Sequence, residues 1–126
     1  MLNKFNPPGI AASPVLSQGV EASGFQRMVF VSGQVGVRSD GSVPDDIAEQ
    51  TRLAIANLYA VLAAGDMGAQ DIAKCTIYLT DAALIGPFMQ AGGGTLPVPP
   101  PAATLLIVKA LAAPNLLVEI EAIAVR

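Results

Sequence analysis

The sequence predicts a single α+β domain over residues 1–126, with the element order ββαβαββ and both helices on one face of a mixed sheet. The chain has 126 residues, 52% of them hydrophobic, which suffices for one domain with its own core. Apolar residues recur at helical spacing over 45–64 and alternate at strand spacing over 71–80 and 116–125. Helices packed on one face of a largely antiparallel or mixed sheet form a two-layer domain.

The first third of the chain predicts two strands. Residues 15–20 predict a short first strand, and residues 28–32 are β-branched and aromatic, which favours a second. Residues 35–37 extend or kink that second strand. Gly33 and Gly36 permit a bulge or a close approach of the backbone to a ligand.

Residues 45–64 predict the main helix. Asp46, followed by Glu49 three residues later, has the spacing of a capping box, and Gly65 is expected to end the helix in a left-handed conformation. One packing stripe follows the helical period: Ile47, Thr51, Ala54, Ile55, Leu58 and Leu62.

The second half of the chain predicts strand, helix, strand and strand. Residues 71–80 alternate as a strand, and residues 81–91 predict a short, imperfect helix. Residues 103–109 and 116–125 predict the last two strands. The Gly- and Pro-rich segment 92–101 is either an ordinary connector or one rim of a pocket.

The last strand has two different faces. Its first face is apolar and belongs in the core: Leu116, Val118, Ile120, Ala122 and Ala124. Its second face mixes apolar residues with Glu119 and Glu121, which suggests a surface shared with another subunit. A partly desolvated carboxylate such as Glu119 suits acid–base chemistry, although charges in a strand also serve as protection against aggregation.

Composition excludes several classes of function. The chain has no histidine, so a Ser-His-Asp triad and a His-ligated zinc site are impossible, and we expect no metal. Its net charge is −3 with scattered basic residues, which argues against nucleic acid. No apolar run is long enough to cross a membrane, and the N-terminus lacks an apolar leader, so we expect a cytoplasmic protein. Cys75, the single cysteine, is expected to be a small buried hydrophobe rather than a reactive thiol.

Three blocks of sequence resemble one known family. They are Val31-Ser32-Gly33-Gln34-Val35, the helix end from Asn57 to Gly65, and Val118-Glu119-Ile120-Glu121-Ala122-Ile123-Ala124. In this order they resemble the RidA/YjgF family. The resemblance implies a chorismate-mutase-like fold, a homotrimer with a small-molecule ligand in each cleft between subunits, and cofactor-free hydrolysis of reactive enamines and imines to a keto acid and ammonia.

The resemblance also implies site residues and departures from the family pattern. Gly33 matches a cleft-lining glycine, and Glu119 matches the glutamate that holds or activates a water. Ala103 stands where the deaminases have an arginine for the substrate carboxylate, Leu105 where many members have cysteine, and Leu16 where a tyrosine covers the cleft. The implied cleft is therefore more apolar, and it lacks a bidentate anchor for an anion.

Lys109 is a candidate replacement cation. If the last two strands pair as a hairpin with Ile107 opposite Glu119, Lys109 lies diagonally on the same face as Glu119. It would then either contact the substrate or form a structural pair with the carboxylate.

Two functions follow from these residues. The first is a diverged imine or enamine deaminase that acts on an altered substrate and uses Glu119 as general acid and base. The second is a trimer that binds a ligand in the same cleft without turnover. The ribonuclease activity also associated with the family is disfavoured, because the chain offers neither a basic surface nor a histidine.

Overall fold

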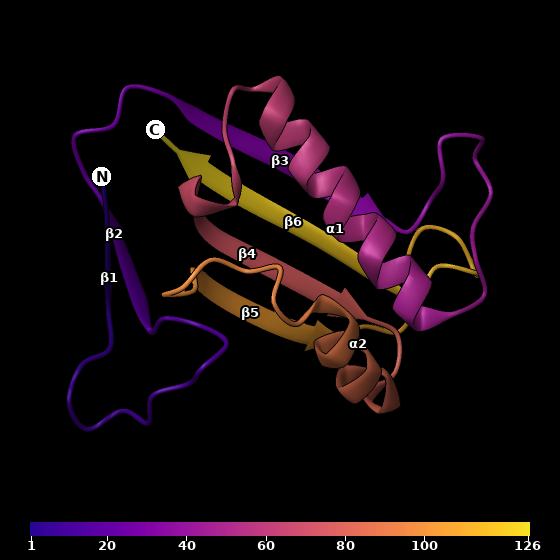
Figure 1. Ribbon diagram of the computed structural model, residues 1–126. Helices are drawn as coiled ribbons and strands as arrows, with labels where there is room; N and C mark the ends of the chain where they lie inside the picture. The colour runs from indigo at the N-terminus through magenta and orange to yellow at the C-terminus, as the bar shows by residue number, and fades with distance from the viewer.

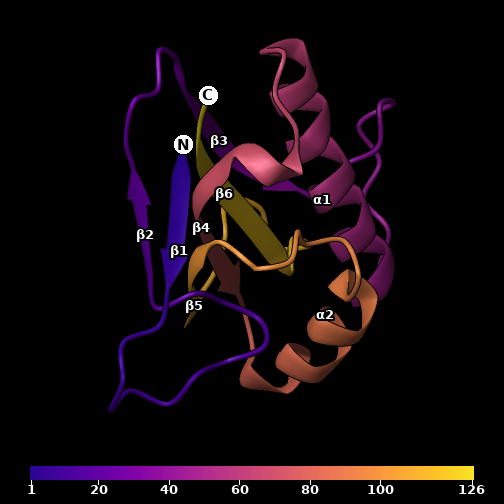
Figure 2. The same cartoon turned by 60° about the vertical axis from the view of Figure 1, so that its left-hand side comes forward.

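The structure is a computed structural model that describes residues 1–126. A four-stranded mixed sheet carries both helices on one face, and a separate two-stranded hairpin lies on the other side of it in Figure 2. The predicted α+β class is therefore confirmed (Figure 1). The elements are β1 Leu2–Phe5, β2 Gly19–Ala22, β3 Met28–Val35, α1 Ile47–Ala64, β4 Ile72–Leu79, α2 Ile85–Gly92, β5 Ala102–Ile107 and β6 Val118–Val125.

The last strand of the chain is a central strand of the sheet. The strand order is β3-β6-β4-β5, with β6 antiparallel to both β3 and β4, and β5 parallel to β4 at the edge. The expected hairpin between β5 and β6 is therefore wrong, because both sides of β6 are already hydrogen-bonded. Lys109 lies beyond the end of β5 and is exposed, and the partners of Glu119 are Val35 and Tyr78.

The core lies between the sheet and α1. Every residue of the predicted core face of β6 is buried, from Leu116 to Ala124 in steps of two. Ala54, Leu58 and Leu62 of α1 pack against this face, as the helical stripe predicts. No helix has both the length and the apolar character needed to cross a membrane.

The N-terminal segment differs from the prediction. The expected strand over residues 15–20 is wrong, because the strand begins only at Gly19 and pairs with β1, which was not predicted. The backbone N–H of Ser17 donates to the carbonyl of Pro101 (3.0 Å), and its hydroxyl donates to that of Pro100 (2.6 Å). These bonds tie the segment to the loop before β5.

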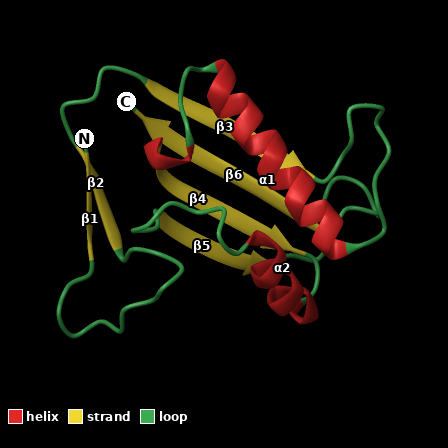
Figure 3. Ribbon diagram, in the orientation of Figure 1, coloured by secondary structure: helices red, strands yellow, loops and turns green.

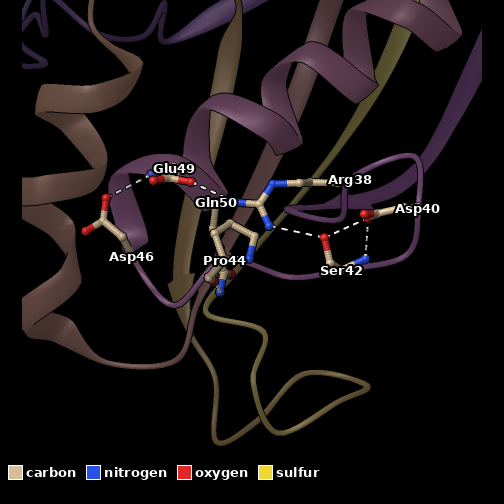
Figure 4. A network of polar contacts seen from close by, with 7 residues as sticks. All are labelled: Arg38, Asp40, Ser42, Pro44, Asp46, Glu49 and Gln50. Carbon is tan, nitrogen blue, oxygen red and sulfur yellow. Dashed lines mark hydrogen bonds and ion pairs between the residues drawn. The ribbon is translucent and has the colours of Figure 1, made fainter.

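The start of α1 is held by a network of polar contacts (Figure 4). The Asp46 carboxylate accepts a hydrogen bond from the Glu49 N–H (3.2 Å), which satisfies a free donor of the first turn. The Glu49 side chain does not complete the predicted capping box; it forms an ion pair with Arg38 (3.0 Å). The Arg38 guanidinium also donates to Ser42, whose side chain and N–H donate to Asp40 in the preceding turn.

The helix ends at Ala64, as predicted, but the left-handed residue that follows it is one position later than expected. Gly65 has φ −90°, so the left-handed residue expected there is wrong. Asp66 takes that conformation instead, with φ 56°. The Met67 N–H then donates to the carbonyl of Leu62 (2.8 Å), which closes the last turn.

Gln50 is the buried link between α1 and the sheet. Its side-chain amide donates to the carbonyls of Pro44 (2.8 Å) and Asn115 (2.9 Å), and its carbonyl accepts from the N–H of Leu117 (2.9 Å). Gly36 permits this contact, because a Cβ there would lie 2.5 Å from the Cα of Gln50. Gln50 thus holds the segment before β6 and fixes the residue at which β6 begins.

We predict that Gln50→Ala lowers the free energy of unfolding by about 2 kcal/mol, because one buried and two partly buried backbone groups would lose their partners. Thermal unfolding followed by circular dichroism measures the change. Gln90→Ala on the exposed side of α2 is the control and should change it by less than about 0.5 kcal/mol. Equal melting temperatures for the two variants would contradict the role given to Gln50.

Candidate functional site

A β-bulge places Gly33 against Glu119. The pairing of β3 with β6 shifts between Val31 and Gln34, so that Ser32 and Gly33 both lie opposite one residue, Glu121. A Cβ on Gly33 would overlap the Glu119 carboxylate and lie 2.6 Å from its Cδ. The predicted bulge at Gly33 is confirmed, and the two candidate residues Gly33 and Glu119 lie together.

Glu119 and Glu121 both lie on the sheet face away from the helices, which we call the open face. The Tyr78 hydroxyl donates a hydrogen bond to the Glu121 carboxylate (2.9 Å), and this bond, with partial burial and the charges of Glu121 and Glu119, raises the pKa of Tyr78. Tyr78 therefore remains a donor at neutral pH. The Tyr78 hydroxyl donates to Glu121 rather than to Glu119, so the Glu119 carboxylate accepts no hydrogen bond from the protein. It can therefore accept one from a water or a ligand.

A cavity of about 470 Å³ lies on the opposite, helix-covered face. Its walls are the inner residues of β4 and β5, the facing sides of α1 and α2, and the segment 92–100, which Figure 3 shows crossing the sheet between α2 and β5. Of its 23 lining residues, 16 are hydrophobic and none is Lys, Arg, Asp or Glu. This volume and lining are typical of small-molecule sites.

The ionisable groups of the cavity are Cys75 and Tyr59. Burial raises the pKa of the Cys75 thiol to about 11, so this thiol is neutral and unreactive, as predicted. Burial likewise raises the pKa of Tyr59, whose hydroxyl donates to the carbonyl of Thr95 in the crossing segment. The cavity therefore carries no formal charge at neutral pH.

The structure divides the predicted site residues into two groups. Leu16, Ala103 and Leu105 line the cavity on the helix side, whereas Gly33 and Glu119 lie on the open face. The two groups also lie toward opposite edges of the sheet, since Gly33 is on the edge strand β3, and Ala103 and Leu105 are on the edge strand β5.

One contributor to these surfaces cannot be identified from the sequence. The contact of Tyr78 with Glu121 depends on the pairing of β4 with β6, which the alternation of β4 does not predict. For the segment 92–101 the sequence predicts either an ordinary connector or a pocket rim, and residues 92–98 and Pro100 line the cavity as a rim. Lys109 is not among the residues of either surface.

Comparison with known proteins gives a consistent family. The family model described as Endoribonuclease L-PSP matches residues 9–126. The chain is 48% identical over 54 residues to the RutC family protein YjgH of Escherichia coli. It is 38% identical over 65 residues to TdcF of the same species, which is named provisionally as a reactive intermediate deaminase. These alignments span 43% and 51% of this chain, but only 41% and 48% of those two proteins.

Solved structures share the whole fold. A protein of the conserved Rid family from Yersinia pestis, YyfB, superposes with a TM-score of 0.87 at 29% identity and covers 99% of this chain and 98% of its own. TdcF of Escherichia coli, crystallised with bound serine, gives a TM-score of 0.72 at 30% identity, covering 98% and 95%.

We predict that Gly33→Ala displaces the Glu119 carboxylate while changing the free energy of unfolding by less than about 1 kcal/mol. The new methyl group overlaps only the end of a flexible side chain, and Gly33 does not need a left-handed φ. Crystal structures of the variant and of Gly86→Ala, where no atom lies within 4 Å of the new Cβ, provide the comparison. A Glu119 carboxylate that keeps its place in Gly33→Ala would refute the close contact.

Proposed function

The chain belongs to the RidA/YjgF family, which the Endoribonuclease L-PSP model describes, and from this premise we propose that it is a cofactor-free imine or enamine deaminase with an altered substrate. The observation that carries the proposal is the position of the Glu119 carboxylate. It contacts Gly33 of an exposed β-bulge and accepts no hydrogen bond from the protein. A family relative, TdcF, has a name that includes the same reaction class.

The proposed reaction needs one carboxylate and one water. Glu119 accepts a proton from the water as the water oxygen bonds to the carbon of the C=N group, and it passes this proton to the nitrogen to give a carbinolamine. The carboxylate then takes the proton of the carbinolamine hydroxyl and delivers it to the nitrogen as the C=O bond forms and the C–N bond breaks. The imine and one water are thus converted into a carbonyl compound and ammonia, and the reaction needs no oxidant or metal.

A ring of copies would bring the two halves of the site together. β3 and β5 are the unpaired edges of the sheet, and the open face exposes Phe30 by 70% and Leu106 by 47%. Contact between the β3 edge of one copy and the β5 edge of the next is head-to-tail, and such contacts form a ring when the rotation between copies closes. A homotrimer of this kind would cover the apolar open face and bring β3, the strand beside Glu119 in one chain, next to β5, the strand that carries Ala103 in its neighbour.

The altered substrate follows from Ala103. A methyl group there cannot form the two parallel hydrogen bonds by which a guanidinium holds a carboxylate. We therefore expect weak activity on small 2-imino acids such as 2-iminopropionate. Lys109, which was considered as a replacement, does not line the cavity.

The second candidate is a ligand-binding trimer without turnover. The observation that favours it is the separation of Glu119 and the cavity on opposite faces of one chain. A ribonuclease, which the description of the family names, is disfavoured by a net charge of −3 and the lack of histidine.

We predict that Glu119→Gln lowers kcat for imine hydrolysis by about a hundredfold or more, the usual contribution of a general acid–base group. The measurement is ammonia release from imines that an amine oxidase or an amino acid oxidase generates in the assay, corrected for the spontaneous rate. Glu21→Gln, on the exposed side of β2, is the charge-matched control and should retain the wild-type rate. Wild-type turnover by Glu119→Gln would remove the carboxylate from the mechanism, and the lack of any wild-type turnover would favour the binding protein.

A further inference from the structure

The cavity on the helix side is unsuited to an anion. Its lining has no charged side chain, and both of its ionisable groups, Cys75 and Tyr59, are neutral at neutral pH. A carboxylate that entered would lose its hydration and meet no counter-charge, which costs several kcal/mol unless hydrogen bonds replace the water. Ala103, whose side chain is a methyl group, lines the cavity and offers an anion no donor.

The hydroxyl groups of the cavity do not supply those hydrogen bonds. The Tyr59 hydroxyl donates to the carbonyl of Thr95, and the Thr95 hydroxyl donates to the carbonyl of Gly92 (2.5 Å). Both protons are thus committed to the segment that forms the rim, and each oxygen offers only lone pairs to a ligand. Lone pairs repel a carboxylate further.

The hydrocarbon surface is what the cavity does offer. Ile77 and Leu105 come from the sheet, Phe88 from α2 and Ile55 from α1, and these side chains enclose the cavity from different sides. Filling such a space with the hydrocarbon part of a ligand contributes about 25 cal/mol for each Å² of apolar surface removed from water.

We propose that the cavity selects uncharged imines with a branched or cyclic hydrocarbon group, together with the ketones or aldehydes that they yield, and excludes 2-imino and 2-oxo acids. The inference rests on the proposed function, since it names the substrate class of that reaction. The binding preference itself can be measured without any turnover.

Two ligands of closely similar shape test the preference. Cyclohexyl methyl ketone is neutral, and cyclohexanecarboxylate has the same ring with an anionic group. In isothermal titration calorimetry with the full chain at neutral pH, the ketone should bind at least about tenfold more tightly, which corresponds to about 1.4 kcal/mol. Equal or tighter binding of the carboxylate, or no binding of the ketone, would overturn the proposal.

Two phenylalanine variants separate the cavity from the surface. Leu105→Phe places a larger ring in the cavity and should weaken ketone binding by about tenfold or more, whereas Val61→Phe, on the exposed side of α1 and outside the cavity, should not change it. Ala103→Arg should reverse the preference in favour of the carboxylate. A similar loss of ketone affinity in both phenylalanine variants would show that the ketone binds outside the cavity, and would overturn the proposal.

The outcome for ligand class is separable from the outcome for catalysis. Preference for the ketone together with undetectable imine hydrolysis would support the ligand class and contradict the deaminase. Rapid hydrolysis of 2-iminopropionate without preference for the ketone would contradict the ligand class and leave the deaminase intact.

Discussion

The candidate site depends on the fact that β6 is hydrogen-bonded on both sides. Pairing with β3 and β4 fixes its register, and the alternation of a strand then places Ile120 in the core and Glu119 on the open face. Gln50 anchors the residue before this strand from α1, so the register is set from the helix layer as well. The position of Glu119 is therefore a property of the whole sheet rather than of one loop.

Local sequence patterns predicted the elements, whereas pairing could not be read from them. The stripe of α1 and the two faces of β6 repeat over many residues, so their periods are unambiguous. The alternation of residues in β5 does not say which strand pairs with it. The hairpin expected between β5 and β6 therefore gave a wrong position for Lys109, since β5 pairs with β4. The strand at residues 2–5 was missed because four residues are too few to show a period. Leu16, Ala103 and Leu105 were grouped only by resemblance to the family, and the structure brings them to one cavity.

The two surfaces have complementary chemistry. The open face carries two carboxylates, one of which accepts a hydrogen bond from Tyr78, whereas the cavity is lined mainly by hydrocarbon side chains and has no charged residue. A C=N group at the boundary of these environments would meet Glu119 and a water on one side and an apolar pocket for its substituent on the other. Under the proposed function, that combination would favour hydrolysis of a neutral imine over that of a small imino acid, and it would require residues from two chains.

Mixing two defective variants tests the proposed two-chain site most directly. Glu119→Gln alone and Leu105→Phe alone should each have little activity toward a neutral imine at low substrate concentration. Co-expression at equal levels would create some clefts with an intact Glu119 from one chain and an intact Leu105 from the next, so roughly a quarter of the wild-type activity should return if copies associate head-to-tail at random. A co-expressed mixture no more active than its separate parents would contradict a site shared between subunits.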